Sequence, residues 1–126
     1  MSITFAASVV SDRLQALTRA LDADTDAGQI IIFNATDDEL VRLTFPKPSL
    51  SGVSGNVLTL HNPAPALVAT SGIATWARLV DGAGATVADV SVGASGSGEV
   101  FEINAATTQL YAGAEITVTA ATLTEV

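Results

Sequence analysis

The chain contains no cysteine, so disulfides, thiolate zinc sites, iron–sulfur clusters and cysteine nucleophiles are all excluded. Aromatic residues make up only 5% of the 126 positions, and charged residues make up 14%, well below the usual quarter. No apolar run approaches the roughly 20 residues that a membrane-spanning helix needs. We therefore expect no thiolate centre and no membrane partner.

Positive charge is also scarce. Five Lys and Arg residues stand against thirteen Asp and Glu residues, which gives a formal net charge of −8. A protein with this charge repels a phosphate backbone and an anionic membrane surface alike, so nucleic acid is not an expected partner. The hydrophobic share of 48% nevertheless excludes a disordered chain.

The pattern of the remaining residues predicts one mainly β domain over residues 1–126. Apolar residues recur at helical spacing near the N-terminus, which predicts a helix over about residues 5–21. Strand-like runs follow over about residues 29–124, separated by turns rich in Gly, Pro and Asp. The clearest hairpin joins residues 75–80 to residues 86–92. Seven or eight strands after one helix predict an antiparallel β-sandwich or a jelly-roll-like barrel.

Some segments carry more specific expectations. Residues 93–98, rich in Gly and Ser, predict a flexible loop, and residues 115–123 alternate as one strand with a single buried face. Trp76 and Tyr111 are the only large amphipathic rings. We expect Trp76 in the core, because its ring contributes so much burial in a small domain. A sugar-binding platform usually needs more exposed aromatic rings than this chain offers.

No catalytic constellation is recognisable. His61 is the only histidine, and a triad needs a nucleophile and an orienting acid beside it. No Gly-x-Ser-x-Gly pattern supplies the nucleophile. We therefore expect no catalytic residue, no cofactor and no enzyme activity, with His61 a partly exposed residue at the end of a strand. An enzyme would require a cleft that gathers His61 with carboxylates and a nucleophilic Ser or Thr.

An acidic run after the predicted helix is the single candidate for a metal. Asp22, Asp24 and Asp26 are spaced as alternate ligands, as in the loops that bind calcium. The sixth loop position is Ala27 instead of Gly, and the twelfth is Phe33 instead of a bidentate Glu. The simpler interpretation is a solvated turn, so we predict no metal site.

The order of the segments carries a resemblance. Residues 30–33 are followed by residues 40–45 and Pro46-Lys47-Pro48, then by residues 72–84 with an aromatic ring, an Arg and an Asp-x-x-Gly turn, and finally by residues 112–119. This arrangement resembles small β-rich virion structural proteins of tailed bacteriophages and prophages.

The resemblance implies a late structural protein, made in the host cytoplasm and placed on the capsid surface of the virion. The role it implies first is capsid decoration: a homo-oligomer, with a trimer favoured, that binds the major capsid protein and stabilises the head shell. The alternatives are a tail or head–tail structural protein, and a receptor- or carbohydrate-binding β-sandwich module.

Contacts with a partner are expected at termini and loops, which reach neighbouring molecules most easily. Small side chains throughout the chain also allow close backbone approach. The predicted contact residues are Met1, Ser2, Ile3, Pro46, Lys47, Pro48 and Gly96.

Overall fold

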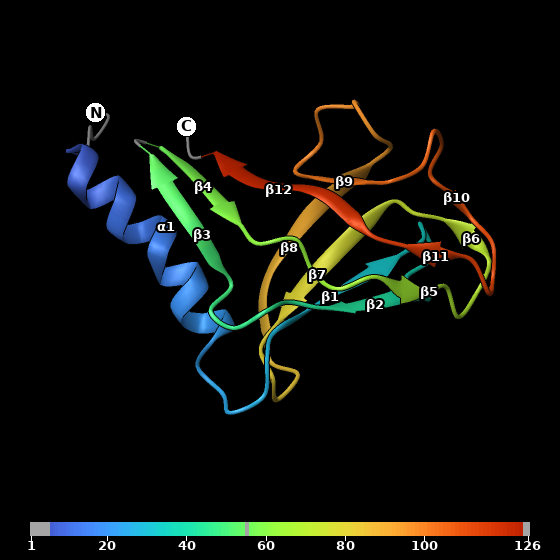
Figure 1. Cartoon of the computed structure of the whole chain (residues 1–126), viewed down its shortest axis with the longest axis horizontal. Helices are drawn as coiled ribbons and strands as arrows, with labels where there is room; N and C mark the ends of the chain where they lie inside the picture. The colour runs from blue at the N-terminus through green and yellow to red at the C-terminus, as the bar shows by residue number, and fades with distance from the viewer. Residues whose placement is uncertain (1–5, 55, 125–126) are drawn as a thin grey trace.

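The computed structural model describes residues 6–54 and 56–124 (Figure 1). Within these residues one helix precedes twelve strands. The elements are α1 (Ala7–Leu21), β1 (Gln29–Phe33), β2 (Glu39–Thr44), β3 (Leu50–Ser54), β4 (Val57–Leu60), β5 (Ala66–Leu67), β6 (Gly72–Ile73), β7 (Trp76–Val80), β8 (Thr86–Gly93), β9 (Phe101–Ile103), β10 (Gln109–Leu110), β11 (Glu115–Ile116) and β12 (Val118–Thr124).

Eight strands form one open, strongly curled sheet in the order β2-β1-β7-β8-β9-β12-β4-β3. Buried side chains from both halves of this main sheet join in one core cluster, which includes Ile30, Ile32, Leu43, Leu58, Leu79, Phe101 and Ile103. The prediction of a mainly β protein with one N-terminal helix is confirmed. The main sheet has eight strands, in line with the expected seven or eight, and four short strands in two small sheets come in addition to that expected total.

The other four strands form two small sheets, β10-β6 and β11-β5. They lie together at the end of the molecule away from α1 (Figure 1). We call this region the distal end and define it as residues 66–73 and 109–116.

Helix α1 packs beside β3 and β4 and near β8 (Figure 1). Its apolar stripe becomes more buried toward the C-terminus: Val9 is exposed, Leu14 and Leu17 are half-buried, and Leu21 is fully buried. The C-terminal half of α1 is therefore the part that the core holds most firmly.

The loop between β8 and β9, predicted as a flexible segment, connects two parallel strands. The two strands pair in parallel, Val92 opposite Phe101 and Gly93 opposite Glu102, although parallel neighbours usually need a dozen or more connecting residues. The carboxylate of Glu102 accepts hydrogen bonds from the backbone N–H groups of Gly96 at 2.9 Å and Gly98 at 3.0 Å. Residues 94–100 therefore form a compact, tied loop.

Residues 115–123 are also not one strand. β11 pairs with β5, whereas β12 pairs with β9 and β4. Between them, Thr117 N donates to Asn104 Oδ1 and Asn104 N donates to Thr117 O, both at 3.1 Å. These bonds hold the chain at the point where it passes from the small sheet to the main sheet.

The two edge strands of the main sheet, β2 and β3, differ in the backbone hydrogen bonds that they make on their outer sides. Along β2, the free carbonyl oxygens of Leu40 and Thr44 accept backbone hydrogen bonds from Ala69 and Ala64, at 2.8 and 2.9 Å. Along β3, the strand pairs only with β4, and its other side makes no backbone hydrogen bond within residues 6–54 and 56–124. Within these residues, β2 is therefore the covered edge.

Candidate interaction surfaces

The predicted contact residues do not form one surface. Met1, Ser2 and Ile3 lie outside the described residues. Pro46, Lys47 and Pro48 are exposed between β2 and β3. Gly96 is exposed in the loop after β8, at a φ of 81° that favours glycine. This loop and the proline stretch lie far apart in Figure 1.

The acidic loop after α1 is tied to the proline stretch. Lys47 Nζ donates to the backbone carbonyl of Asp24. The carboxylate of Asp22 accepts hydrogen bonds from Ser49 N at 3.1 Å and from Ser49 Oγ at 3.3 Å, and Asp24 Oδ2 accepts one from Asp26 N at 3.3 Å. The ammonium group of Lys47 thus lies against the backbone of the loop that carries the three carboxylates. Across the described part of the chain, no three ligating side chains converge on a metal position.

The prediction that Trp76 lies in the core is wrong. Along β7 the side chains of Ala77 and Leu79 are fully buried, so the alternation of the strand places Trp76 on the outer face of the main sheet. There the ring is half-buried and stacks on Phe33 of β1, with the ring centroids 4.5 Å apart and 16° between the planes.

The polar groups around Trp76 are engaged within the protein. The indole N–H donates to Asp37 Oδ1 at 3.2 Å, and the guanidinium of Arg78 lies 5.1 Å from the ring centroid. Arg78 Nε also pairs with Asp89 Oδ1 at 2.9 Å, and this hydrogen bond raises the pKa of Arg78 above its ordinary value. One face of the Trp76 ring is therefore stacked on Phe33, and its N–H group is hydrogen-bonded to the carboxylate of Asp37.

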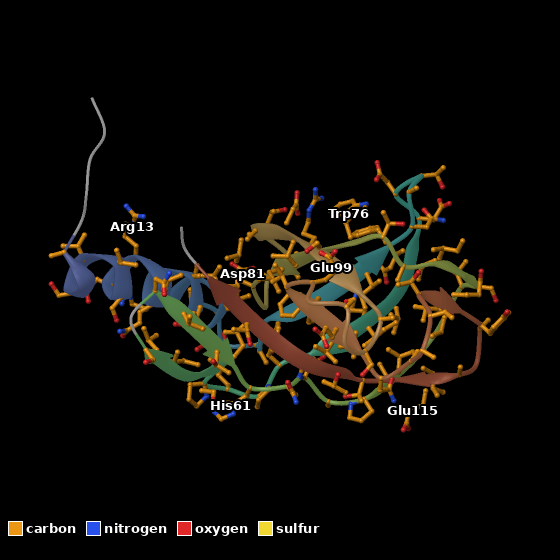
Figure 2. All side chains as sticks on the ribbon, turned by 90° about the horizontal axis from the view of Figure 1, so that it is seen from above. Arg13, His61, Trp76, Asp81, Glu99 and Glu115 are labelled. Carbon is orange, nitrogen blue, oxygen red and sulfur yellow. The ribbon has the colours of Figure 1, made fainter. Side chains whose placement is uncertain are left out.

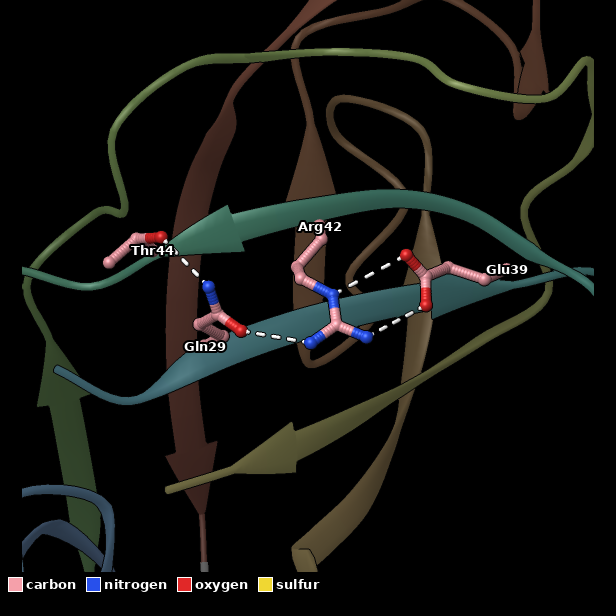
Figure 3. A network of polar contacts seen from close by, with 4 residues as sticks. All are labelled: Gln29, Glu39, Arg42 and Thr44. Carbon is pink, nitrogen blue, oxygen red and sulfur yellow. Dashed lines mark hydrogen bonds and ion pairs between the residues drawn. The ribbon is translucent and has the colours of Figure 1, made fainter. Parts of the chain in front are cut away.

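A second polar network lies on β1 and β2 (Figure 3). Arg42 Nη2 donates to Glu39 Oε1 at 2.9 Å, and Arg42 Nη1 donates to Gln29 Oε1 at 3.1 Å. Gln29 Nε2 then donates to Thr44 Oγ1 at 3.2 Å. The hydrogen bond with Glu39 raises the pKa of Arg42. Because its donors are bound internally, Arg42 is not arranged to clamp an anionic ligand.

His61 lies exposed beside a shallow hollow of about 360 Å³. The hollow is lined by hydroxyl side chains, namely Ser51, Thr59, Thr119 and Thr122. No hydrogen bond joins the imidazole to a hydroxyl or carboxylate group of the described residues. A general base must lie within hydrogen-bond reach of the proton that it removes. His61 and Trp76 also lie on opposite sides of the molecule in Figure 2, so the structure does not join them in one site.

The distal end carries the residues that the sequence did not single out as contacts. Leu67, Ile73 and Tyr111 are exposed by 64%, 56% and 66%. They stand on β5, on β6 and directly after β10. The two halves of the distal end are joined by hydrogen bonds from Ala112 N to Ser71 Oγ and from Gly113 N to Val68 O, both at 2.8 Å.

Exposed apolar side chains gathered at one end of a protein commonly mark a contact with another protein. In the sequence, Leu67 and Ile73 stand in short apolar runs, one after Pro65 and one after Ser71 and Gly72, and nothing in these runs marks the two side chains as exposed. Periodicity alone cannot decide which side of a two-residue strand is covered, since that depends on the strand paired beside it.

Within the described residues, no helix is long and apolar enough to cross a membrane. Comparison of the chain with protein-family models, with curated proteins and with solved structures gives no match.

Proposed function

We propose that this protein is a structural virion protein of a tailed bacteriophage, most simply a capsid decoration protein that binds and stabilises the head shell. The observation that supports it is the distal end, where Leu67, Ile73 and Tyr111 present apolar side chains to solvent at one end of a curled sheet. A shell-binding subunit needs a rigid body with a localised contact surface, and this arrangement supplies both.

In this role the partners are the phage major capsid protein and further copies of the same chain, with a trimer favoured. The protein acts on the capsid surface and performs no reaction. Nucleic acid and membrane are not partners, because a body of charge −8 is repelled by phosphate.

Binding to head shells tests the proposal. We expect the purified protein to co-sediment saturably with shells of its phage that lack it, and to raise their melting temperature. The triple variant Leu67→Ser, Ile73→Ser, Tyr111→Ser should bind roughly 100-fold more weakly, because three apolar contacts are lost. Tyr111→Phe keeps the ring and should bind like the parent. Equal binding of the triple variant would show that the distal end is not the contact.

The same purified protein also tests the two alternative functions. A tail or head–tail protein would bind purified tails or connectors and leave shells unbound. A carbohydrate-binding module would bind host surface glycans. The exposure of Tyr111 is compatible with glycan binding, but Trp76 has one face and its N–H engaged within the protein.

A further inference from the structure

The hollow beside His61 is lined by polar side chains that the rest of the protein does not use. Thr119 Oγ1 donates to Glu102 O at 3.3 Å. Within the described residues, the side chains of the other polar lining residues make no hydrogen bond to a protein group, so their donors and acceptors are available to a ligand. These five residues are Ser51 on β3, Thr59 on β4, His61 and Asn62 directly after β4, and Thr122 on β12.

The pairing of neighbouring strands places the hydroxyl groups. Thr59 and Thr122 stand directly opposite each other in the antiparallel β4–β12 pair, so their Cβ atoms lie about 4.5–5.5 Å apart. Ser51 joins them from β3, one residue before Gly52, which pairs with Thr59. Threonine has few side-chain rotamers because it is branched at Cβ. The hydroxyl groups therefore stand on a rigid surface, and a ligand loses little free energy in ordering them.

The polar side chains on the other half of the main sheet differ, because they bind one another. Arg42 pairs with Glu39, and Arg78 pairs with Asp89. Such pairs leave few groups for a ligand. At the hollow, by contrast, donors and acceptors from three strands and one loop converge without partners among the described residues. A small number of convergent polar groups in a hollow is typical of a ligand site.

The chemistry of the lining favours a neutral ligand that is rich in hydroxyl groups. No Asp, Glu, Lys or Arg is among the lining residues, so the hollow offers no charge to an anion or to a metal ion. The net charge of −8 repels an anion in addition. Hydroxyl groups both donate and accept hydrogen bonds, as do the Asn62 amide and a neutral imidazole. Sugar hydroxyls have the same dual character, and the threonine methyl groups can contact the C–H groups of a sugar ring.

We propose that this hollow binds a neutral saccharide, held by hydrogen bonds to Thr59, Thr122 and Asn62. Its volume of about 360 Å³ lies near the lower end of the range for small-molecule sites, which suits a mono- or disaccharide. No Phe, Tyr or Trp lines the hollow. Binding by one copy is therefore weak, with a dissociation constant on the order of 1 mM, because exposed hydrogen bonds contribute little net free energy.

The hollow and the distal end are separate surfaces. Strands β3 and β4 lie beside α1, whereas the distal end lies away from it (Figure 1). In Figure 2, His61 lies nearer to α1 than Glu115, which belongs to the distal end. A copy docked on a shell through the distal end would leave the hollow accessible, and many copies on one particle would bind a glycan surface with increased avidity. The inference goes beyond the proposed function and does not depend on it.

Titration with neutral methyl glycosides tests the site. We expect at least one of the methyl glycosides of glucose, galactose, mannose and N-acetylglucosamine to shift the amide NMR signals of residues 59–62 and 119–122 saturably. Glucuronate, an anionic sugar, and glycerol, a polyol without a ring, are the controls and should give no saturable shift. The proposal is overturned if none of the four glycosides gives a saturable shift up to about 50 mM. An equal response to glucuronate, or shifts confined to Trp76 or Tyr111, also overturns it.

Variants without the hydroxyl groups supply a second test. Thr59→Val, Thr122→Val keeps the shape of both side chains and should bind the same glycoside roughly 10-fold more weakly. Thr86→Val, Thr107→Val makes the same change at two exposed threonines outside the hollow and should bind like the parent. Asn62→Ala changes no strand residue and should also weaken binding, so the test stays decisive if the first variant does not fold.

Equal affinity of the two threonine variants, or of Asn62→Ala and the parent, overturns the inference. The outcome is independent of shell binding. A parent protein that binds the glycoside but no shell overturns the decoration role alone, and one that binds shells but no glycoside overturns the saccharide site alone.

Discussion

At the scale of single residues, one glycine allows two loops that are distant in sequence to pack closely against each other. Gly82 lies in the β7–β8 turn, and a Cβ at this position would lie 2.1 Å from the backbone oxygen of Asp26. Real Cβ atoms do not approach backbone atoms so closely, so only glycine lets the turn rest against the loop that follows α1. Gly52 on β3 is the opposite case, since a Cβ there meets nothing within 4 Å.

We predict that Gly82→Ala lowers the free energy of unfolding by about 1–3 kcal/mol, because the added methyl group forces two backbone segments apart. Gly52→Ala should leave it unchanged or raise it by about 0.5 kcal/mol, because alanine restricts the unfolded chain. Urea denaturation followed by tryptophan fluorescence measures both. Equal stability of the two variants would contradict the close contact at Gly82.

At the scale of elements, the loop of residues 94–100 depends on one side chain. β8 and β9 are parallel neighbours joined by a short connection, and the carboxylate of Glu102 holds the N–H groups of Gly96 and Gly98. Charge-assisted hydrogen bonds of this kind keep a glycine-rich loop ordered despite its large conformational freedom.

Glu102→Ala should therefore release the loop and lower the free energy of unfolding by about 1 kcal/mol. Amide hydrogen exchange at Gly96 and Gly98 should become faster, while exchange in β1 and β7 stays unchanged. Glu99→Ala removes an exposed neighbouring carboxylate and serves as the control. Unchanged exchange at the two glycines in Glu102→Ala would show that other contacts hold the loop.

At the scale of the whole molecule, charge is strongly unbalanced. The net charge of −8 creates self-repulsion in the compact state. The Arg42–Glu39 and Arg78–Asp89 pairs are exposed and offset little of it. Salt screens both the attraction within these ion pairs and the repulsion among the excess carboxylates. The repulsion is the larger of the two contributions to stability, because it involves many like charges.

Stability should accordingly rise with ionic strength. Between 10 and 500 mM NaCl we predict a gain on the order of 1 kcal/mol in the free energy of unfolding. Asp12→Asn, Glu115→Gln changes two exposed acids and brings the net charge from −8 to −6. Since repulsion scales with the square of charge, the gain should fall to roughly half. A loss of stability with added salt would mean that attractive pairs dominate.

Much of the fold was predictable from local patterns. The helix was expected over 5–21 and runs over Ala7–Leu21, and the hairpin of β7 and β8 falls where the turn residues indicated. Both depend on neighbours within a few residues. The outer position of Trp76, the parallel pairing of β8 with β9 and the exposure of Leu67 were not predictable in this way.

The sequence by itself determined the class of the protein: mainly β, acidic and free of thiol chemistry, because periodicity, charge and composition are properties of the chain. Only the tertiary structure decided which apolar residues stay exposed, which sheet edge is covered and where Lys47 and Glu102 find their partners. Those outcomes depend on segments that meet across long sequence separations, and no local pattern records which segments will meet.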